Sequence, residues 1–389
     1  MKIGIVSLYG WLKVWDNYGT LLQNYALQAH LARMGHTSYW IRTRTSDAGR
    51  HPRPNIAVRV RSGIRGALQP LLGPSISERI ADFNAQHPRA FGDFMRRFVP
   101  CTEREYSIEE LMEQPPEADA LLVGSDQVWR DVTPLNFLAF GDQRLPRIAY
   151  AVSAPWPDLD DSWIARASRE VPRFKAVSVR ETEGIDVCRR IGIPDAEHVI
   201  DPTLLLERSD YMALAEADGV SKKVPADGLL AYFVNVRDLA QVPWNAMTHF
   251  SSTRGFPISV IPLQGAELTI PKEYHFVPTP TEWIRSFESA QMIVTNSYHG
   301  ALFAVIMRKP FLVCLQGGET AAENCRFTSA LSPLGLSNRL LPQSTWTRMS
   351  ATDLGKRMAT PIDWNSVKQQ LAIVRDKSET FLSNALSMR

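Results

Sequence analysis

Short apolar segments bounded by turn residues recur along this chain and constrain its fold more than any other feature. In the first half, each segment has the length of a strand and is mostly apolar on both faces, which is typical of strands buried in a parallel sheet. These segments are KIGIVSL (2–8), DALLVG (119–124), RIAYAVS (147–153), KAVSVR (175–180) and HVID (198–201). Between them lie helical patterns such as TLLQNYALQAHLARMG, whose apolar stripe ends at Gly35. The alternation predicts an α/β fold.

A second series of strand-like segments begins after residue 220. Helical patterns such as TEWIRSFESA and ALFAVIM separate its members, so this series predicts a second doubly wound sheet. The segments are GLLAYFV (228–234), PISVIPL (257–263), QMIVTNS (291–297) and PFLVCL (310–315).

The length of 389 residues favours two domains over one. The polar stretch at 207–228 is the best candidate for their junction. We therefore expect a Rossmann-like domain at 1–210, a second one at 225–345, and a helical segment at 346–389 whose partner domain is not predicted. Two such domains facing each other would place the site in a cleft between the carboxyl ends of both sheets.

Composition narrows the classes of partner and cofactor. The formal charge of +2 gives no overall preference for nucleic acid or an acidic polymer. The four cysteines show no CxxC or CxxH spacing, so we expect no metal site and no disulfide framework. The N-terminus lacks the long apolar region of a signal peptide, and no apolar run reaches about 18 residues. These features predict a soluble, cytoplasmic protein.

The DNYG stretch at 16–19 lies between the first expected strand and the first expected helix. Asn17, Tyr18 and Gly19, with Thr20, would then stand at a helix N-terminus, which favours anions. The alternative is an ordinary turn with a threonine cap. The G-x-G-x-x-G dinucleotide fingerprint is missing, which argues against NAD.

The GSDQVW stretch at 124–129 follows another expected strand. Gly124 would let the backbone approach a ligand, while Ser125, Asp126 and Gln127 present polar groups. Trp129 offers a ring for stacking on a sugar. The alternative is that Asp126 caps the loop and Trp129 belongs to the core.

Two features of the second half lie at the carboxyl edge of the second expected sheet. Arg237 follows the segment GLLAYFV, where a guanidinium could pair with phosphate or carboxylate, although it could equally be a surface arginine. In TNSYHG, Asn296 and Ser297 end a strand while His299 and Gly300 open a helix, so the imidazole would face the cleft. Histidine suits proton transfer near neutral pH. A structural histidine is the alternative.

Residues 42–66 contain seven arginines and one acid, Asp47. The favoured interpretation is a solvated insertion. The other is a basic surface that contacts anionic lipid, or a lipid-pyrophosphate acceptor, at the inner face of the membrane.

Taken together and in order, these motifs resemble those of the polysaccharide pyruvyl transferase family, in its S-[YF]-H-G subgroup. The resemblance runs over residues 1–341. The motifs that carry it are NYGTLLQNYALQ, VGSDQVW, IAYAVSA, VSVRE, IDPTLLL, TNSYHGALFAVIMRKPF and NCRFTSALSPLGLSNRL.

The resemblance implies a fold like that of GT-B glycosyltransferases and a role in polysaccharide biosynthesis, such as that of an exopolysaccharide. It implies transfer of a pyruvyl group from phosphoenolpyruvate, as co-substrate and without a cofactor, to two saccharide hydroxyls as a cyclic ketal. His299 would transfer protons, with Asp126 as the candidate base. Donor-side residues would be Arg237, Asn296, Ser297, Gly300 and Arg326, and acceptor-side residues would be Asn17, Tyr18, Gly19, Ser125, Gln127 and Trp129.

One departure from the family keeps alternatives open. Some members carry arginine two residues before the histidine, where this chain has Ser297, so Arg326 or Arg180 would have to supply the charge. A glycosyltransferase using a nucleotide sugar is the second hypothesis, but Glu282 and Glu288 fall inside an expected helix. A saccharide-binding assembly protein without turnover is the third.

Overall fold

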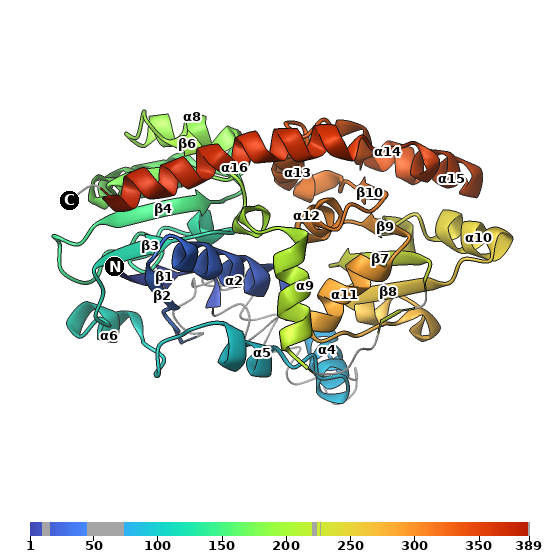
Figure 1. Cartoon of the computed structure of the whole chain (residues 1–389), viewed down its shortest axis with the longest axis horizontal. Coiled ribbons are helices and arrows are strands. Elements are labelled where there is room, and N and C mark those ends of the chain that lie inside the picture. The colour runs from blue at the N-terminus through green and yellow to red at the C-terminus, as the bar shows by residue number, and fades with distance from the viewer. Residues whose placement is uncertain (10–15, 45–73, 220–223, 226, 388–389) are drawn as a thin grey trace, which may run out of the picture.

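The computed structural model describes residues 1–9, 16–44, 74–219, 224–225 and 227–387 (Figure 1). Of the arginine-rich stretch, residues 45–66 therefore lie outside the described residues, so the solvated insertion and the lipid-contacting surface both stay predictions. Within the described part, no helix combines the length and the apolar character needed to cross a bilayer.

The first sheet contains six parallel strands in the order β2-β1-β3-β4-β5-β6. All five strands predicted in this half are present, although β6 is only two residues long. The sequence pattern missed β2, because its TSYW segment begins with two polar residues. The strands are β1 (Lys2–Val6), β2 (Thr37–Trp40), β3 (Ala120–Val123), β4 (Arg147–Val152), β5 (Ala176–Val179) and β6 (Glu197–His198).

The second sheet has five parallel strands in the order β11-β10-β9-β7-β8. The four predicted strands are confirmed, and the two-residue β11 adds to them. The strands are β7 (Leu229–Val234), β8 (Ile258–Leu263), β9 (Met292–Thr295), β10 (Phe311–Cys314) and β11 (Leu340–Leu341). Their apolar side chains are buried on both faces, as the sequence pattern predicts.

Helices cover both sheets (Figure 1). In the N-terminal half they are α2 (Tyr18–Arg33), α4 (Ile76–Gln86), α5 (Phe91–Phe98), α6 (Ile108–Glu113), α7 (Asp161–Glu170) and α8 (Glu183–Arg190). The later ones are α9 (Arg208–Ala217), α10 (Trp244–Arg254), α11 (Pro280–Ser289), α12 (Tyr298–Ile306), α13 (Cys325–Leu331), α14 (Gln343–Trp346), α15 (Ala351–Ala359) and α16 (Trp364–Ser387).

The predicted junction at 207–228 contains helix α9, so it is not a plain linker. A capping box at Glu207 and Asp210 starts the helix, and Tyr211 is buried on one face. The ring of Tyr211 lies 4.8 Å from that of Phe303 on α12. Figure 1 shows α9 standing between the two halves.

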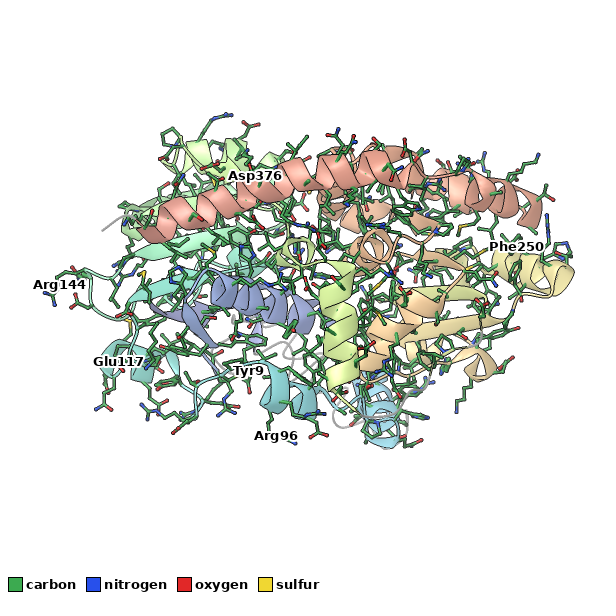
Figure 2. All side chains as sticks on the ribbon, viewed as in Figure 1. Tyr9, Arg96, Glu117, Arg144, Phe250 and Asp376 are labelled. Atoms are coloured by element: carbon green, nitrogen blue, oxygen red, sulfur yellow. The ribbon has the colours of Figure 1, made fainter. Side chains whose placement is uncertain are left out.

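The C-terminal helix α16 joins the two halves from outside. It starts beside the second half and runs back over the first, where the chain ends (Figure 1). Ser378 accepts a hydrogen bond from the amide of Ile200, and Phe381 packs 6.2 Å from Tyr150. Figure 2 shows Asp376 on this helix, with Arg144 and Phe250 at opposite ends of the molecule. The segment at 346–389 thus contacts both domains: α15 packs on the C-terminal core, and the later part of α16 packs on the N-terminal domain.

Candidate functional site

The carboxyl ends of the N-terminal strands meet at one buried guanidinium. Arg180, which follows β5, donates to Glu181 at 2.9 Å and to Asp201 at 3.1 Å, and contacts Asp126 at 3.4 Å. It also donates to the hydroxyl of Ser153 at 3.1 Å. All five residues are at most 8% exposed. Buried charges persist only when they are paired and hydrogen-bonded, and this cluster meets that condition.

Two acids of the cluster, Asp126 and Asp201, have pKa values below their ordinary value. Burial alone would raise the pKa of both Asp126 and Asp201. For Asp126, the Arg180 guanidinium, the His299 imidazole and a hydrogen bond from Thr20 outweigh burial, so its pKa lies below its ordinary value. For Asp201, the imidazole has the largest opposing effect, and its pKa lies well below the ordinary value.

His299 enters this cluster from the opposite domain. Ser297 caps helix α12, accepting a hydrogen bond from the amide of Gly300, and His299 occupies the second helical position. Its Nε2 lies 3.5 Å from Oδ2 of Asp201, a polar contact across the domain boundary that becomes an ion pair when the imidazole is protonated. Nε2 is buried and makes no hydrogen bond of good geometry with any described residue. Asp201 is thus the polar group that faces Nε2, at a distance longer than a strong hydrogen bond.

Gly19 makes the approach of His299 possible. A Cβ atom at Gly19 would lie 2.0 Å from Nδ1 and 2.3 Å from Cγ of the imidazole. Because real Cβ contacts are never so short, any side chain here would displace the ring. The N-terminal turns of α2 and α12 thus face each other with the imidazole between them, and Gly19 serves the site by its lack of a side chain.

The loop after β3 is shaped to present Asp126. Asp126 has a positive φ of 74°, a strained conformation for a non-glycine residue that is common at functional sites. Thr20 fixes the carboxylate through a 2.9 Å hydrogen bond. Gly124 is needed for another reason than predicted, since a Cβ there would lie 2.0 Å from the carbonyl oxygen of Tyr150. The missing side chain of Gly124 therefore allows strand β4 to pack closely against this loop.

Three predicted acceptor residues belong to the core instead. Trp129 is fully buried and stacks 4.9 Å from Phe137, so its ring is covered by protein. Tyr18 is fully buried and stacks 5.4 Å from Trp283 of the other domain. Ser125 is fully buried, and its hydroxyl donates to the carbonyl of Ala151. The structure thus gives these three side chains core contacts, and the local pattern does not distinguish a side chain facing a cleft from one facing the core.

Two other residues predicted on the acceptor side, Asn17 and Gln127, lie near the site and form hydrogen bonds with different groups. Asn17 is half-buried and caps α2 by accepting a hydrogen bond from the Thr20 amide. Gln127 is buried beside Asp126 and reaches Glu323 of the C-terminal domain at 3.4 Å. Gln127 therefore lies at the domain boundary, in a position to touch a ligand there.

On the donor side, Asn296 and Gly300 shape the turn between β9 and α12. The amide group of Asn296 bonds both the N–H and the carbonyl of Val234, which fixes β7 to the turn. A Cβ at Gly300 would lie 2.5 Å from the hydroxyl oxygen of Thr295. The structure thus gives Asn296, Ser297 and Gly300 scaffold contacts around His299, where the sequence predicted donor contacts.

Arg237 lies apart from this network. Its side chain is exposed and passes over Gly265, in the loop after β8. It makes no ion pair with a described residue, and its backbone amide donates to the side chain of Gln241. Arg326 is half-buried and lies 3.5 Å from Glu323. The two arginines predicted to hold the donor therefore come from different parts of the C-terminal domain.

The sequence analysis assigned no role to Asp201 and placed Thr20 only at an anion-favouring helix start or as its cap, although both residues lie at the centre of the site. Their signals were present: IDPT places an acid at a strand end, and Thr20 follows the DNYG turn. Neither motif reveals that these residues meet His299 and Asp126, because that proximity arises only from the packing of two domains.

Two surface cavities lie away from this network. One of about 480 Å³ and one of about 780 Å³ occupy the N-terminal domain near the end of α16, and both are lined by Phe174 and Lys175. Arg144, which lines the larger, stands at the far end of the molecule in Figure 2. Their linings lack the charged cluster around His299, so the candidate site rests on the cluster rather than on cavity size.

Known structures share this architecture along nearly the whole chain. UDP-GlcNAc 2-epimerase from Methanocaldococcus jannaschii superposes with a TM-score of 0.54 and 11% identity, covering 97% of this chain and 99% of that one. The same enzyme in complex with UDP-GlcNAc and UDP gives a TM-score of 0.50 and 10% identity, covering 96% and 99%. At this identity the likeness establishes the fold alone, which is GT-B-like with two Rossmann-like domains.

Sequence comparison is more specific. The family described as polysaccharide pyruvyl transferase matches residues 17–316, which include Gly19, Asp126, Arg180, Asp201 and His299. No curated protein matches the chain.

Proposed function

Because the chain belongs to the polysaccharide pyruvyl transferase family, we propose that it transfers a pyruvyl group from phosphoenolpyruvate to two hydroxyls of a saccharide. The product is a cyclic ketal, and phosphate is released. Family membership supports a transferase role in polysaccharide biosynthesis. The donor, the ketal chemistry and the roles of single residues are our proposal.

The observation that carries the proposal is the buried imidazole of His299 beside two ionised carboxylates. His299 comes from the C-terminal domain, whereas Asp126 and Asp201 come from the N-terminal one. Proton transfer to carbon needs an acid that is positioned and shielded from water. The contact with Asp201 orients the ring, and the two carboxylates balance the charge of its protonated form.

In the proposed reaction, the protonated imidazole of His299 gives its proton to C3 of the donor, which makes C2 electrophilic. One saccharide hydroxyl adds to C2, and its proton returns to His299 by way of Asp126. The bond between C2 and the phosphate oxygen then breaks as the second hydroxyl closes the ketal. The proton of that hydroxyl leaves with the phosphate, so protons and electrons balance without a further reagent.

The charge on the donor requires cations other than Arg180. Three carboxylates already surround that guanidinium, and its face lies 4.4 Å from the ring centroid of Tyr298. Arg180 therefore pairs with these carboxylates. It does not take the place of the arginine that some family members carry at position 297, where this chain has serine. We propose that Arg237 and Arg326 bind the phosphate and the carboxylate of the donor. Arg326 is the nearer of the two to the charged cluster, because it interacts with Tyr298, whose ring contacts Arg180.

The nucleotide-sugar hypothesis gains no support from the carboxylates that it would require in the C-terminal domain. Glu282 is used in the capping box of α11, and Glu288 pairs with Arg208. The carboxylates beside His299 come from the other domain and are paired with Arg180. We therefore retain phosphoenolpyruvate as the donor.

The test is release of phosphate from phosphoenolpyruvate in the presence of a panel of saccharide acceptors, together with calorimetric titration of the donor. We expect His299→Ala to lower the rate about 100-fold or more while the fold is kept, since positioned acid–base groups contribute at least that much. Arg237→Ala should weaken donor binding. Unchanged release in His299→Ala would remove the imidazole from the mechanism.

Gly19→Ala tests the geometry without removing a functional group. The added methyl group must displace the His299 ring, so we expect about a 100-fold loss of rate. Gly92→Ala is the matched control, because Gly92 has the same second position in helix α5 and a Cβ there meets only ordinary contacts. Equal rates in the two variants would contradict the proposed role of the ring position.

A further inference from the structure

A buried amide on helix α2 connects the start of that helix to the loop that carries Asp126. Gln23 lies three residues after Thr20, so the two side chains are neighbours on the same face of the helix. Gln23 is completely buried, at a position where an apolar residue would cost less to bury. A buried amide persists when its polar atoms are hydrogen-bonded, so its partners show what it holds in place.

The amide of Gln23 makes three hydrogen bonds. Its Oε1 accepts from the backbone N–H of Ser125 at 3.1 Å, and its Nε2 donates to the Thr20 carbonyl at 3.2 Å. Nε2 also donates to the hydroxyl of Ser7, which follows β1, at 2.9 Å. Because a backbone N–H only donates and a carbonyl only accepts, these partners fix the orientation of the amide. Neither a carboxylate nor an apolar side chain could make the same three bonds.

These bonds hold both backbone polar groups of Ser125, the residue before Asp126. Gln23 binds its N–H, and the hydroxyl of Ser7 donates to its carbonyl at 3.3 Å. On the other side of the loop, the carbonyl of Asp126 accepts from the amide of Ser153 at 3.0 Å. The residue with the positive φ is therefore held between α2 on one side and the end of β4 on the other.

The same amide also holds the partner of the Asp126 side chain. Thr20 donates its hydroxyl to Oδ2 of Asp126 at 2.9 Å, while its own carbonyl accepts from Gln23. Gln23 thus acts on the carboxylate in two ways, through the backbone before it and through the hydroxyl that binds it. In this orientation Oδ1 of Asp126 lies 3.4 Å from the Arg180 guanidinium.

We propose that Gln23 is a positioning residue for Asp126, which sets the direction of the carboxylate beside His299 and Arg180. The inference deepens the proposed function and rests on it only for the role of that carboxylate in proton transfer. Gln23 acts through Ser125 and Thr20 and not on a reacting atom. Loss of its bonds turns the carboxylate and leaves the fold in place, because contacts with β4 still hold the loop.

The first experiment needs no substrate. Burial raises the pKa of Asp126, but Arg180, His299 and the Thr20 bond lower it below its ordinary value, against a smaller opposing effect of Asp201. Asp126 therefore stabilises the fold above the ordinary aspartate pKa of about 4, and this contribution is lost as the pH falls. Urea unfolding between about pH 5 and pH 3 measures the slope of that loss.

We expect Asp126→Asn to flatten this slope, and Gln23→Met to produce about half of that flattening. Methionine keeps the volume of the side chain but makes none of the three bonds. The carboxylate then loses part of its contact with Thr20 and Arg180, so its pKa rises towards the ordinary value.

The matched control is Gln28→Met. Gln28 is a buried amide on the same helix, and its hydrogen bond goes to Asn24 of α2 at 2.6 Å. Its loss should lower stability equally at every pH and leave the slope unchanged. Ser7→Ala is a milder variant, because it removes only the hydroxyl between Gln23 and the Ser125 carbonyl, and it should flatten the slope less than Gln23→Met does.

An unchanged slope in Gln23→Met, or an equal flattening in Gln28→Met, would overturn the inference. If Gln23→Met does not fold, Ser7→Ala decides in its place: a flattened slope supports the role of these bonds, and an unchanged slope refutes it.

The second experiment measures phosphate release from phosphoenolpyruvate with a saccharide acceptor. We expect kcat to fall about tenfold in Gln23→Met while KM for the donor changes less than about twofold, since Asp126 is assigned to the acceptor hydroxyl. If the unmodified protein releases no phosphate but the slope changes as expected, the proposed function fails and the positioning of Asp126 stands. A fall in kcat with an unchanged slope refutes the action of Gln23 through Asp126 and leaves the proposed function standing.

Discussion

The turn after β5 and the turn after β9 meet at the domain boundary, where the Arg180 guanidinium lies over the Tyr298 ring, yet the two turns carry different kinds of side chain. The first presents Arg180 and Glu181, buried charges that pair with acids from neighbouring strands. The second presents Asn296 and Ser297, neutral side chains that bond the backbone around them. His299, two residues after Ser297, brings its imidazole from the second turn to Asp201 of the first domain.

The difference shows how the site divides its tasks. A neutral turn costs little to bury, because each polar atom finds a backbone partner within its own domain. A charged turn is stable only when every member of its ion-pair network is present, because loss of one partner leaves the remaining charges buried and unpaired. The charged side therefore supplies a fixed electrostatic environment, and the neutral side positions the imidazole to which we assign proton transfer.

The largest effect is expected when the charged set is broken. Arg180→Met would leave Asp126, Asp201 and Glu181 buried without their cation, at a cost of about 3–5 kcal/mol in the free energy of unfolding. Arg339→Met is the matched control: Arg339 is equally buried, but its guanidinium donates to the backbone carbonyls of Arg357 and Thr360. For Arg339→Met we expect a loss of about 1–2 kcal/mol in the free energy of unfolding. Urea unfolding of both variants measures the difference, and equal losses would contradict the view that unpaired carboxylates dominate.

The sequence predicted the neutral side of this comparison better than the charged side. Apolar runs located β5 and β9 because buried parallel strands have a distinctive composition, and the change from strand to helix placed His299 at a helix start. Those are local properties. Cap residues such as Ser297 are also local, but the sequence assigned Ser297 to the donor because a helix cap and a ligand contact look alike in one dimension.

The charged side could not be predicted because its members come from separate strands. Asp126 follows β3, Arg180 follows β5 and Asp201 follows β6, and no spacing in the chain reveals that they converge. Trp129 shows the same limit for an apolar residue, since only the packed structure reveals that Phe137 covers its ring. Sequence patterns identify strand ends, whereas the order of strands in the sheet decides which ends meet.

Acid should weaken the charged side selectively. The pKa values of Asp126 and Asp201 are lower in the folded protein than the ordinary aspartate value of about 4. Their contribution to the free energy of unfolding is therefore complete above that ordinary pKa. It is lost as the pH falls towards the folded-state pKa values. Between pH 5 and pH 3 we expect each carboxylate to account for about 1 kcal/mol of lost stability. Asp201→Asn should therefore have a shallower acid limb than the unmodified protein in urea unfolding at several pH values.

The control for the acid limb is Asp142→Asn. Asp142 is a surface residue whose pKa is lowered to about 2 by its hydrogen bonds with Arg144. Solvent screens this pair, so its removal should change the slope much less than removal of Asp201. A slope that responds equally to both substitutions would show that acid sensitivity is spread over the surface and does not reside in the cluster around Arg180.

The smallest effect is expected on the neutral side, at Ser297. Its hydroxyl caps α12, so Ser297→Ala should cost about 1 kcal/mol of stability, and Ser350→Ala, at the capped start of α15, should cost a similar amount. Since the capping contact is a scaffold contact, we expect the affinity for phosphoenolpyruvate to change less than about twofold in Ser297→Ala. Calorimetry of the donor decides the point, because a large loss of affinity in Ser297→Ala alone would return this serine to the donor site. In that case the second turn would bind substrate directly, and the division between a charged side that sets the field and a neutral side that positions His299 would have to be abandoned.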